Sequence, residues 1–129
     1  MNNFGVRAES DLITRSQAES VVRRVYDSVR ILCTGKGDVR DRLKDASLVL
    51  IFLREEDFPK HLQKDYKWII TQVSKYKSQN RNYEGNINAT MRRIKNTTGQ
   101  NIAKRIFKLY SDIQNIRGFP LQEYRNPKE

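Results

Sequence analysis

The amino-acid sequence predicts an all-α protein, a compact single-domain bundle of about five mostly antiparallel helices. Apolar residues recur at helical spacing in successive segments, and short loops join these segments. The one apolar run that also fits a buried strand would have no partner strand elsewhere in the chain. The length of 129 residues suits one domain and is enough to bury a core without a metal ion or a disulfide.

The first helix is expected over residues 12–34. Its start lies at Ser10 or at Ser16, which begins a capping box. Gly35 is expected to end the helix, because glycine adopts the left-handed conformation of a helix C-terminus at no steric cost. One apolar stripe runs along this segment: Ala18, Val21, Val22, Val25, Val29, Leu32 and Cys33.

The second helix is expected to begin after an N-cap at Asp38 and to continue to Leu53. Every residue from Leu48 to Leu53 is apolar, which fits either a buried strand or a buried helix. We prefer the helix, because no Gly or Pro interrupts the segment from Asp38 onward. A helix that is apolar on all sides must be covered on all sides, and this requirement allows for a homo-oligomer.

Three more helices are expected in the second half. Pro59 suits the first position of a helix that runs to about Lys77. A polar loop over residues 78–86 follows, and the tetrapeptide NTTG at 96–99 is expected to be a turn between the last two helices. The final helix should end at Gly118. Two stripes mark these last helices: Ile87, Met91 and Ile94, then Ile102, Ile106, Leu109, Ile113 and Ile116.

The bundle is therefore expected to span residues 10–118, with a flexible N-terminal tail over 1–9 and an extended C-terminal tail over 119–129. No segment fits a secretory signal or a membrane span. The single cysteine, Cys33, cannot form an intramolecular disulfide and is expected to be buried and unreactive. These features predict a cytoplasmic protein that does not contact membranes.

Charge is distributed unevenly along the chain. The net charge is +10. Residues 1–57 hold 10 Lys/Arg and 10 Asp/Glu, whereas residues 58–129 hold 15 Lys/Arg and 5 Asp/Glu. All of the excess positive charge therefore lies in the second half, which indicates a polyanionic partner such as DNA or RNA, or an acidic protein surface.

The strongest local signal lies in residues 87–110, which hold six cations and no acid. Basic side chains gathered on one face displace the counterions of a phosphate backbone, so we expect a small non-enzymatic nucleic-acid-binding protein, an accessory subunit that contacts phosphates through a basic helical hairpin. The alternative is a solvated basic face. The expected nucleic-acid-binding residues are Lys75, Lys77, Arg81, Arg92, Arg93, Lys95, Lys104, Arg105 and Lys108.

Two refinements of this hypothesis depend on local pattern. The hairpin has the order of a helix-turn-helix, although Asn96 stands where the turn usually has glycine; an ordinary helical hairpin is the alternative. Aromatic residues lie between the cations and suit stacking on unpaired bases, and Tyr83 is the one expected to be exposed. Tyr76 and Tyr110 are instead expected to cover the core.

Two other functions are alternative hypotheses. The first is a protein-interaction or adaptor module, which forms a homo-oligomer or docks on an acidic partner protein. The second is a ribonuclease, because six residues separate Arg54 from His61, and an Arg can stabilise phosphorane charge while a His moves protons near neutral pH. This pair resembles that of HEPN-type ribonucleases, which cleave RNA across a dimer, but Pro59 interrupts the helix between them.

The sequence has no other arrangement typical of catalysis. No Ser-His-Asp or Cys-His set can be placed, and the His, Cys and acidic residues lack metal-ligand spacing. We therefore expect no catalytic residues, no cofactor and no metal ion.

Overall fold

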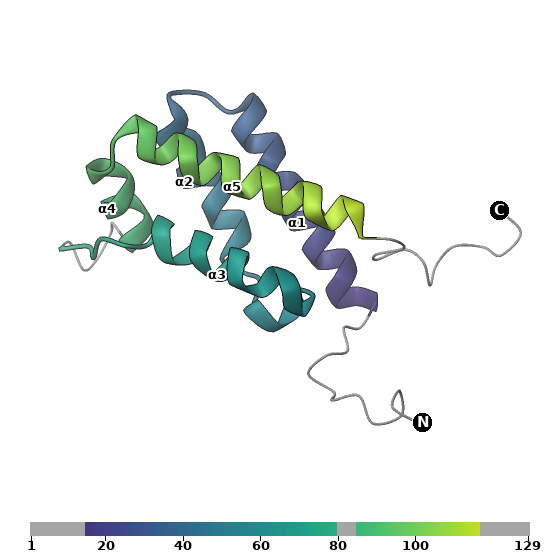
Figure 1. The fold of residues 1–129 in the computed structure, drawn as a ribbon. Helices are drawn as coiled ribbons and strands as arrows, with labels where there is room; N and C mark the ends of the chain where they lie inside the picture. The colour runs from purple at the N-terminus through teal and green to yellow at the C-terminus, as the bar shows by residue number, and fades with distance from the viewer. Residues whose placement is uncertain (1–14, 80–84, 117–129) are drawn as a thin grey trace, which may run out of the picture.

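In the computed structural model, which describes residues 15–79 and 85–116, the chain folds into helices joined by short connections (Figure 1). No β-strand occurs among these residues, so the predicted all-α fold class is confirmed. The elements in order are α1 (Arg15–Thr34), α2 (Val39–Leu50), the short 3-10 helix η2 (Glu55–Asp57), α3 (Lys60–Val73), α4 (Gly85–Arg93) and α5 (Asn96–Asn115).

The helices enclose one apolar core. α1 packs against α2 and α5, and α5 also packs against α3, which runs in the opposite direction (Figure 1). α4 packs against α2 and α3. The largest fully buried side chains come from every long helix and include Val25, Leu43, Ile69, Ile106 and Leu109. Most residues of the predicted apolar stripes therefore form the core.

α1 ends at Thr34, as predicted, but the details at its two ends differ from the expected ones. Arg15, the first described residue, is already helical, so Ser16 lies inside α1 and not at its cap; the other expected start, Ser10, lies outside the described residues. Gly35 follows the helix and donates its N–H to the Ile31 carbonyl at 2.8 Å, but its φ is not positive. A Cβ at Gly35 would lie 2.7 Å from that carbonyl oxygen, so glycine is needed there for space. The left-handed position is at Gly37, with φ of 87°.

Cys33 is exposed, contrary to the expectation that it would be buried. It lies in the last turn of α1, and every described residue from Cys33 to Asp38 is exposed. The end of the helix therefore extends beyond the helices that cover its apolar stripe.

The N-terminus of α2 forms as predicted. The Asp38 carboxylate accepts hydrogen bonds from the backbone N–H groups of Arg40 and Asp41, which completes the N-cap. A hydrogen bond from the Arg40 guanidinium, together with the backbone bonds, lowers the pKa of Asp38. The cap is therefore charged over the whole physiological range.

The C-terminus of α2 does not form as predicted. The helix ends at Leu50 and not at Leu53, and the expected all-round burial is wrong. Leu48, Ile51 and Phe52 are 45%, 41% and 70% exposed. Ile51 and Phe52 lie three and four residues after Leu48, the spacing of one helical face, and we name these three exposed side chains the apolar patch.

Phe58 and Tyr66 form the centre of the junction between α2, η2 and α3. The Phe58 side chain is 1% exposed, and its ring stacks on Tyr66 with 4.5 Å between centroids. The Tyr66 hydroxyl lies 2.8 Å from the Leu50 carbonyl oxygen and 2.6 Å from that of Leu53. The hydroxyl carries one proton, which these two carbonyl oxygens share at the point where the chain leaves α2.

Tyr66 makes the stability of the fold depend on pH in the alkaline range. Burial, with a smaller contribution from nearby Asp57, raises the pKa of Tyr66 to about 12. Because the folded protein prefers the neutral phenol, the stabilisation is complete below pH 10 and is lost as the pH rises from about 10 to 12. Tyr66→Phe removes this titration, although it also removes the donor of the Leu53 carbonyl; the Leu50 carbonyl still accepts from the backbone N–H of Leu53.

We therefore expect the difference in unfolding free energy between the wild type and Tyr66→Phe to change with pH. Urea unfolding at pH 8 should show the variant to be less stable by about 1–3 kcal/mol. The difference should shrink by about 1–2 kcal/mol at pH 12, after allowance for screening by nearby solvent. A difference that stays constant across this range would show that the phenol titrates as in the unfolded chain.

The helix boundaries in the second half differ from the expected ones. α3 ends at Val73, before Lys77, and α3 begins at Lys60 with Pro59 at its N-cap. The NTTG segment is not a turn, because α5 already begins at Asn96. Its glycine, Gly99, is buried against α2, where a Cβ would lie 3.1 Å from a methyl group of Val39. Close packing on α2 therefore requires a small residue there.

Candidate nucleic-acid interface

The segment that follows α3 is held along one side of α4. The backbone N–H of Tyr76 donates to Thr90 Oγ1 at 2.8 Å, and that of Ser78 donates to Asn86 Oδ1 at 2.9 Å. Asn86 and Thr90 are four residues apart and share one face of α4. This pairing places Lys75 and Lys77, which lie in the segment, next to α4.

The Tyr76 ring brings Lys75 together with Arg93, a cation of α4. The Arg93 guanidinium lies 5.4 Å and the Lys75 ammonium 5.7 Å from the centre of the Tyr76 ring, within cation–π range. Both cations are exposed, and the ring between them is half-buried. Tyr76 is therefore occupied by the protein's own charges and is not available as a stacking surface.

Lys95 completes this group from the start of α5. It occupies the N-cap position but makes no capping hydrogen bond through its side chain, and the first turn of α5 contains no acid. We name the exposed cations around α4 the α4 basic surface. Its members are Lys75, Lys77, Arg92, Arg93 and Lys95.

Acidic residues are scarce on the α4 basic surface. Between Lys75 and Lys108 the sequence has one acid, Glu84, which lies outside the described residues. Among the residues that the structure describes, no carboxylate lies within ion-pair distance of Lys75, Lys77, Arg93 or Lys95. The positive charge of these four side chains is left for solvent or for a partner.

The cations of α5 differ from this pattern. Lys108 Nζ lies 2.8 Å from Asp112 and 3.5 Å from Asp65, and Arg105 Nε lies 3.6 Å from Asp65. The hydrogen bond that Lys108 donates to Asp112, with the charge of Asp65, raises the pKa of Lys108. The Arg105 guanidinium also covers the Trp68 ring at 4.4 Å. Of the α5 cations, Lys104 alone has no acidic partner among the described residues.

The absence of acids from residues 87–110 therefore does not leave every α5 cation without an acidic partner. Asp65 belongs to α3, and Asp112 lies just beyond the window of residues 87–110. The predicted binding residues separate into the α4 basic surface, the exposed Lys104, and the paired Arg105 and Lys108. The last of them, Arg81, lies outside the described residues.

The predicted hairpin is not a helix-turn-helix. The connection between α4 and α5 consists of Ile94 and Lys95, and α4 packs against α2 and α3 instead of along α5. A helix-turn-helix instead joins its two helices by a turn of about three to four residues. Tyr83, the aromatic residue expected to be exposed, lies outside the described residues.

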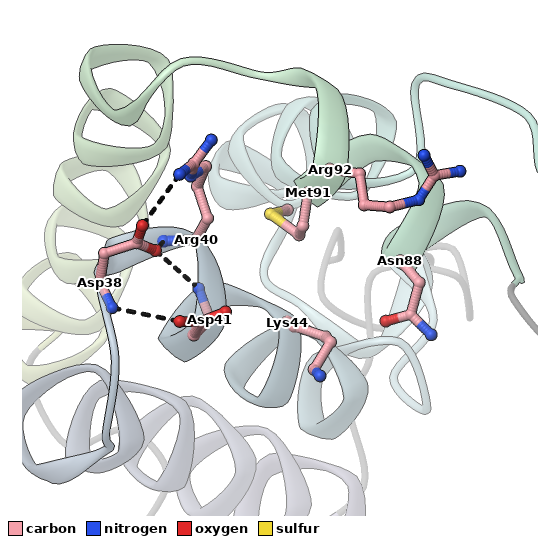
Figure 2. A pocket seen from close by; sticks show the side chains of 7 residues that line it. All are labelled: Asp38, Arg40, Asp41, Lys44, Asn88, Met91 and Arg92. Carbon is pink, nitrogen blue, oxygen red and sulfur yellow. Dashed lines mark hydrogen bonds and ion pairs between the residues drawn. The ribbon is translucent and has the colours of Figure 1, made fainter.

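An open pocket of about 440 Å³ lies between α2 and α4 beside this surface (Figure 2). Asp38 and Asp41 line one end, where Asp38 pairs with Arg40 at 3.0 Å. Arg40 also donates to the Ile94 carbonyl at 3.2 Å and so ties α2 to the end of α4. Arg92 extends away from the two carboxylates, at the opposite side of the pocket (Figure 2).

The Arg54 and His61 pair has a different setting. Arg54 contacts Asp57 at 3.3 Å and Glu56 at 3.7 Å. His61 is exposed and lines an open pocket of about 500 Å³ with Asp65, Lys108 and Asp112 among its neighbours. Arg54 is not among the described residues that line this pocket. In this chain the two side chains therefore face different neighbours.

No protein-family model, curated protein or solved structure matches this chain. Within the described residues, no helix is long and apolar enough to cross a membrane.

Proposed function

We propose that this protein is a small, non-enzymatic nucleic-acid-binding protein that serves as an accessory subunit and contacts phosphates through the α4 basic surface. The observation that supports the proposal best is Lys95. A cation at the N-terminus of a long helix is opposed by the helix dipole, and no acid in the first turn of α5 offsets it. A phosphate would satisfy both Lys95 and the dipole.

The other members of the α4 basic surface divide into two kinds. Arg92 and Arg93 lie in the last turn of α4, where the helix dipole stabilises cations. Their positions are therefore explained by the helix itself. Lys75 and Lys77 lie outside any helix, so this stabilisation does not apply to them. Two cations that share the Tyr76 ring also repel each other. A phosphate backbone relieves this repulsion and releases condensed counterions.

Binding of the purified protein to labelled duplex DNA, single-stranded DNA and RNA across a salt series tests the proposal. We expect binding to at least one of them, with an affinity that falls steeply with salt at a log–log slope of about −3 to −5, as for four to five phosphate contacts. Absence of binding near physiological salt, or binding insensitive to salt, would contradict the proposal.

The apolar patch supports a second candidate function, a protein-interaction module. Beside the patch, a pocket of about 350 Å³ is lined by Leu48, Ile51, Ile70 and Ile87. Contiguous exposed apolar side chains are uncommon on monomers and often mark contact sites. A homo-oligomer at micromolar concentration, measured by sedimentation, would favour this function.

A further inference from the structure

Three aromatic rings from α1 and α5 meet on the outside of the bundle. The Tyr110 ring lies 6.3 Å from that of Tyr26 and 6.3 Å from that of Phe107, both tilted. Tyr26 is 50% and Phe107 56% exposed, whereas Tyr110 is half-buried against the core. We call these residues the aromatic trio. The interleaving of Phe107 and Tyr110 with cations is visible in the sequence, but Tyr26 lies far from them in the chain.

Packing between α1 and α5 does not explain the whole trio. Tyr110 fills the space between the helices, and each aromatic pair contributes a modest stabilisation. However, Tyr26 and Phe107 keep half or more of their surface in water. Exposed aromatic area in a contiguous group is a feature of contact sites.

Positive charges lie on both sides of the trio. Lys104 is exposed one helical turn before Phe107, and Arg23 is exposed one turn before Tyr26. Neither cation has an acidic partner among the described residues. Arg30, on the other side of Tyr26, pairs with Asp27 at 3.8 Å. Aromatic rings beside unpaired cations suit a ligand that has flat bases and a negative backbone.

We propose that the aromatic trio stacks on unpaired bases, so that the ligand of this protein is a single strand. The inference rests on the proposed function, because the α4 basic surface supplies the phosphate contacts. Lys95 and Phe107 are roughly 18 Å apart along α5, at ~1.5 Å per residue. Lys104 lies between them, so one strand that follows α5 contacts the α4 basic surface and the trio together. The bases of a duplex are stacked inside and do not reach the rings.

Three labelled ligands of equal length separate stacking from charge: a single-stranded oligonucleotide, the same backbone with abasic sites throughout, and a duplex. Anisotropy titrations compare the wild type with Tyr26→Ala and Phe107→Ala. The control, Phe52→Ala, removes an even more exposed ring that lies in the apolar patch. Phe107→Tyr keeps an aromatic ring at this position and tests whether a ring is sufficient for single-strand binding. Thermal unfolding confirms that each variant is folded.

We expect Phe107→Ala and Tyr26→Ala each to weaken single-strand binding by roughly 5- to 150-fold, as for the loss of one stacked base. Binding of the abasic strand should be unchanged, and Phe107→Tyr and Phe52→Ala should bind like the wild type. If both alanine variants bind the single strand as tightly as the wild type does, the trio does not stack on bases. The same follows if their affinity for the abasic strand falls by the same factor as their affinity for the single strand.

The same titrations distinguish this inference from the proposed function. If the wild type binds single and abasic strands while the trio variants change nothing, the inference fails and the proposed function stands. If the wild type binds none of the three ligands, both fail. Equal affinity of the wild type for the duplex and the single strand would also overturn the inference.

Discussion

Replacing Lys75, Arg93 and Lys95 together with alanine is expected to remove most of the affinity of this protein for nucleic acid. Each phosphate contact contributes about −0.7 to −0.9 to the log–log slope of affinity against salt. The slope of the triple variant should therefore be shallower than that of the wild type by about 2–3. Binding should weaken to a similar extent on every base sequence, because backbone contacts carry no sequence information. Titration of the same oligonucleotide at several salt concentrations measures both effects.

A control variant of equal charge is available in the same chain. Lys36, Lys64 and Lys67 are exposed and lie in the α1–α2 connection and on α3. Replacing these three with alanine removes the same net charge as the first variant does. We expect the control to keep most of the salt slope. If both triple variants lose affinity equally, then net charge alone governs binding and the α4 basic surface has no special role.

The second large effect is expected at the junction of α2, η2 and α3. Phe58→Ala should destabilise the fold by about 3–5 kcal/mol, because it empties a fully buried site and removes the ring that stacks on Tyr66. The substitution also removes the packing that holds Tyr66 in place. The Tyr66 hydroxyl lies within hydrogen-bond distance of the carbonyl oxygens of Leu50 and Leu53. Chemical unfolding of the wild type and the variant gives the difference.

Phe52→Ala provides the matched control for this prediction. Phe52 lies six residues earlier and is 70% exposed, although its ring is covered in part by the Arg24 guanidinium at 5.1 Å. We expect Phe52→Ala to lower the free energy of unfolding by less than about 1 kcal/mol. Similar losses for the two phenylalanine variants would mean that Phe58 is not the centre of the junction.

The helix content could be predicted from the sequence because each helix has an apolar stripe. Positions such as Leu43, Ile69 and Ile106 follow the helical period and are fully buried in the fold. The period does not reveal which apolar residues stay uncovered. Phe52 and Phe58 are both phenylalanines in one connecting region, and only the arrangement of η2 and α3 decides that Phe58 is buried.

The candidate site could be predicted in composition but not in arrangement. A local excess of Lys and Arg is visible in the sequence, whereas the pairing of Lys108 with Asp65 depends on the packing of α5 against α3. The hydrogen bond between Tyr76 and Thr90, which aligns Lys75 with α4, also joins positions far apart in the chain. Tyr26 was missed as a possible contact for the same reason.

Amide chemical-shift mapping with a short oligonucleotide tests most directly whether nucleic acid binds at the α4 basic surface. We predict that the shifts concentrate at residues 75–78, the last turn of α4 and the first turn of α5, and extend along α5 toward Phe107. Shifts confined to the apolar patch, or the absence of any shift at saturating oligonucleotide, would contradict binding at this surface.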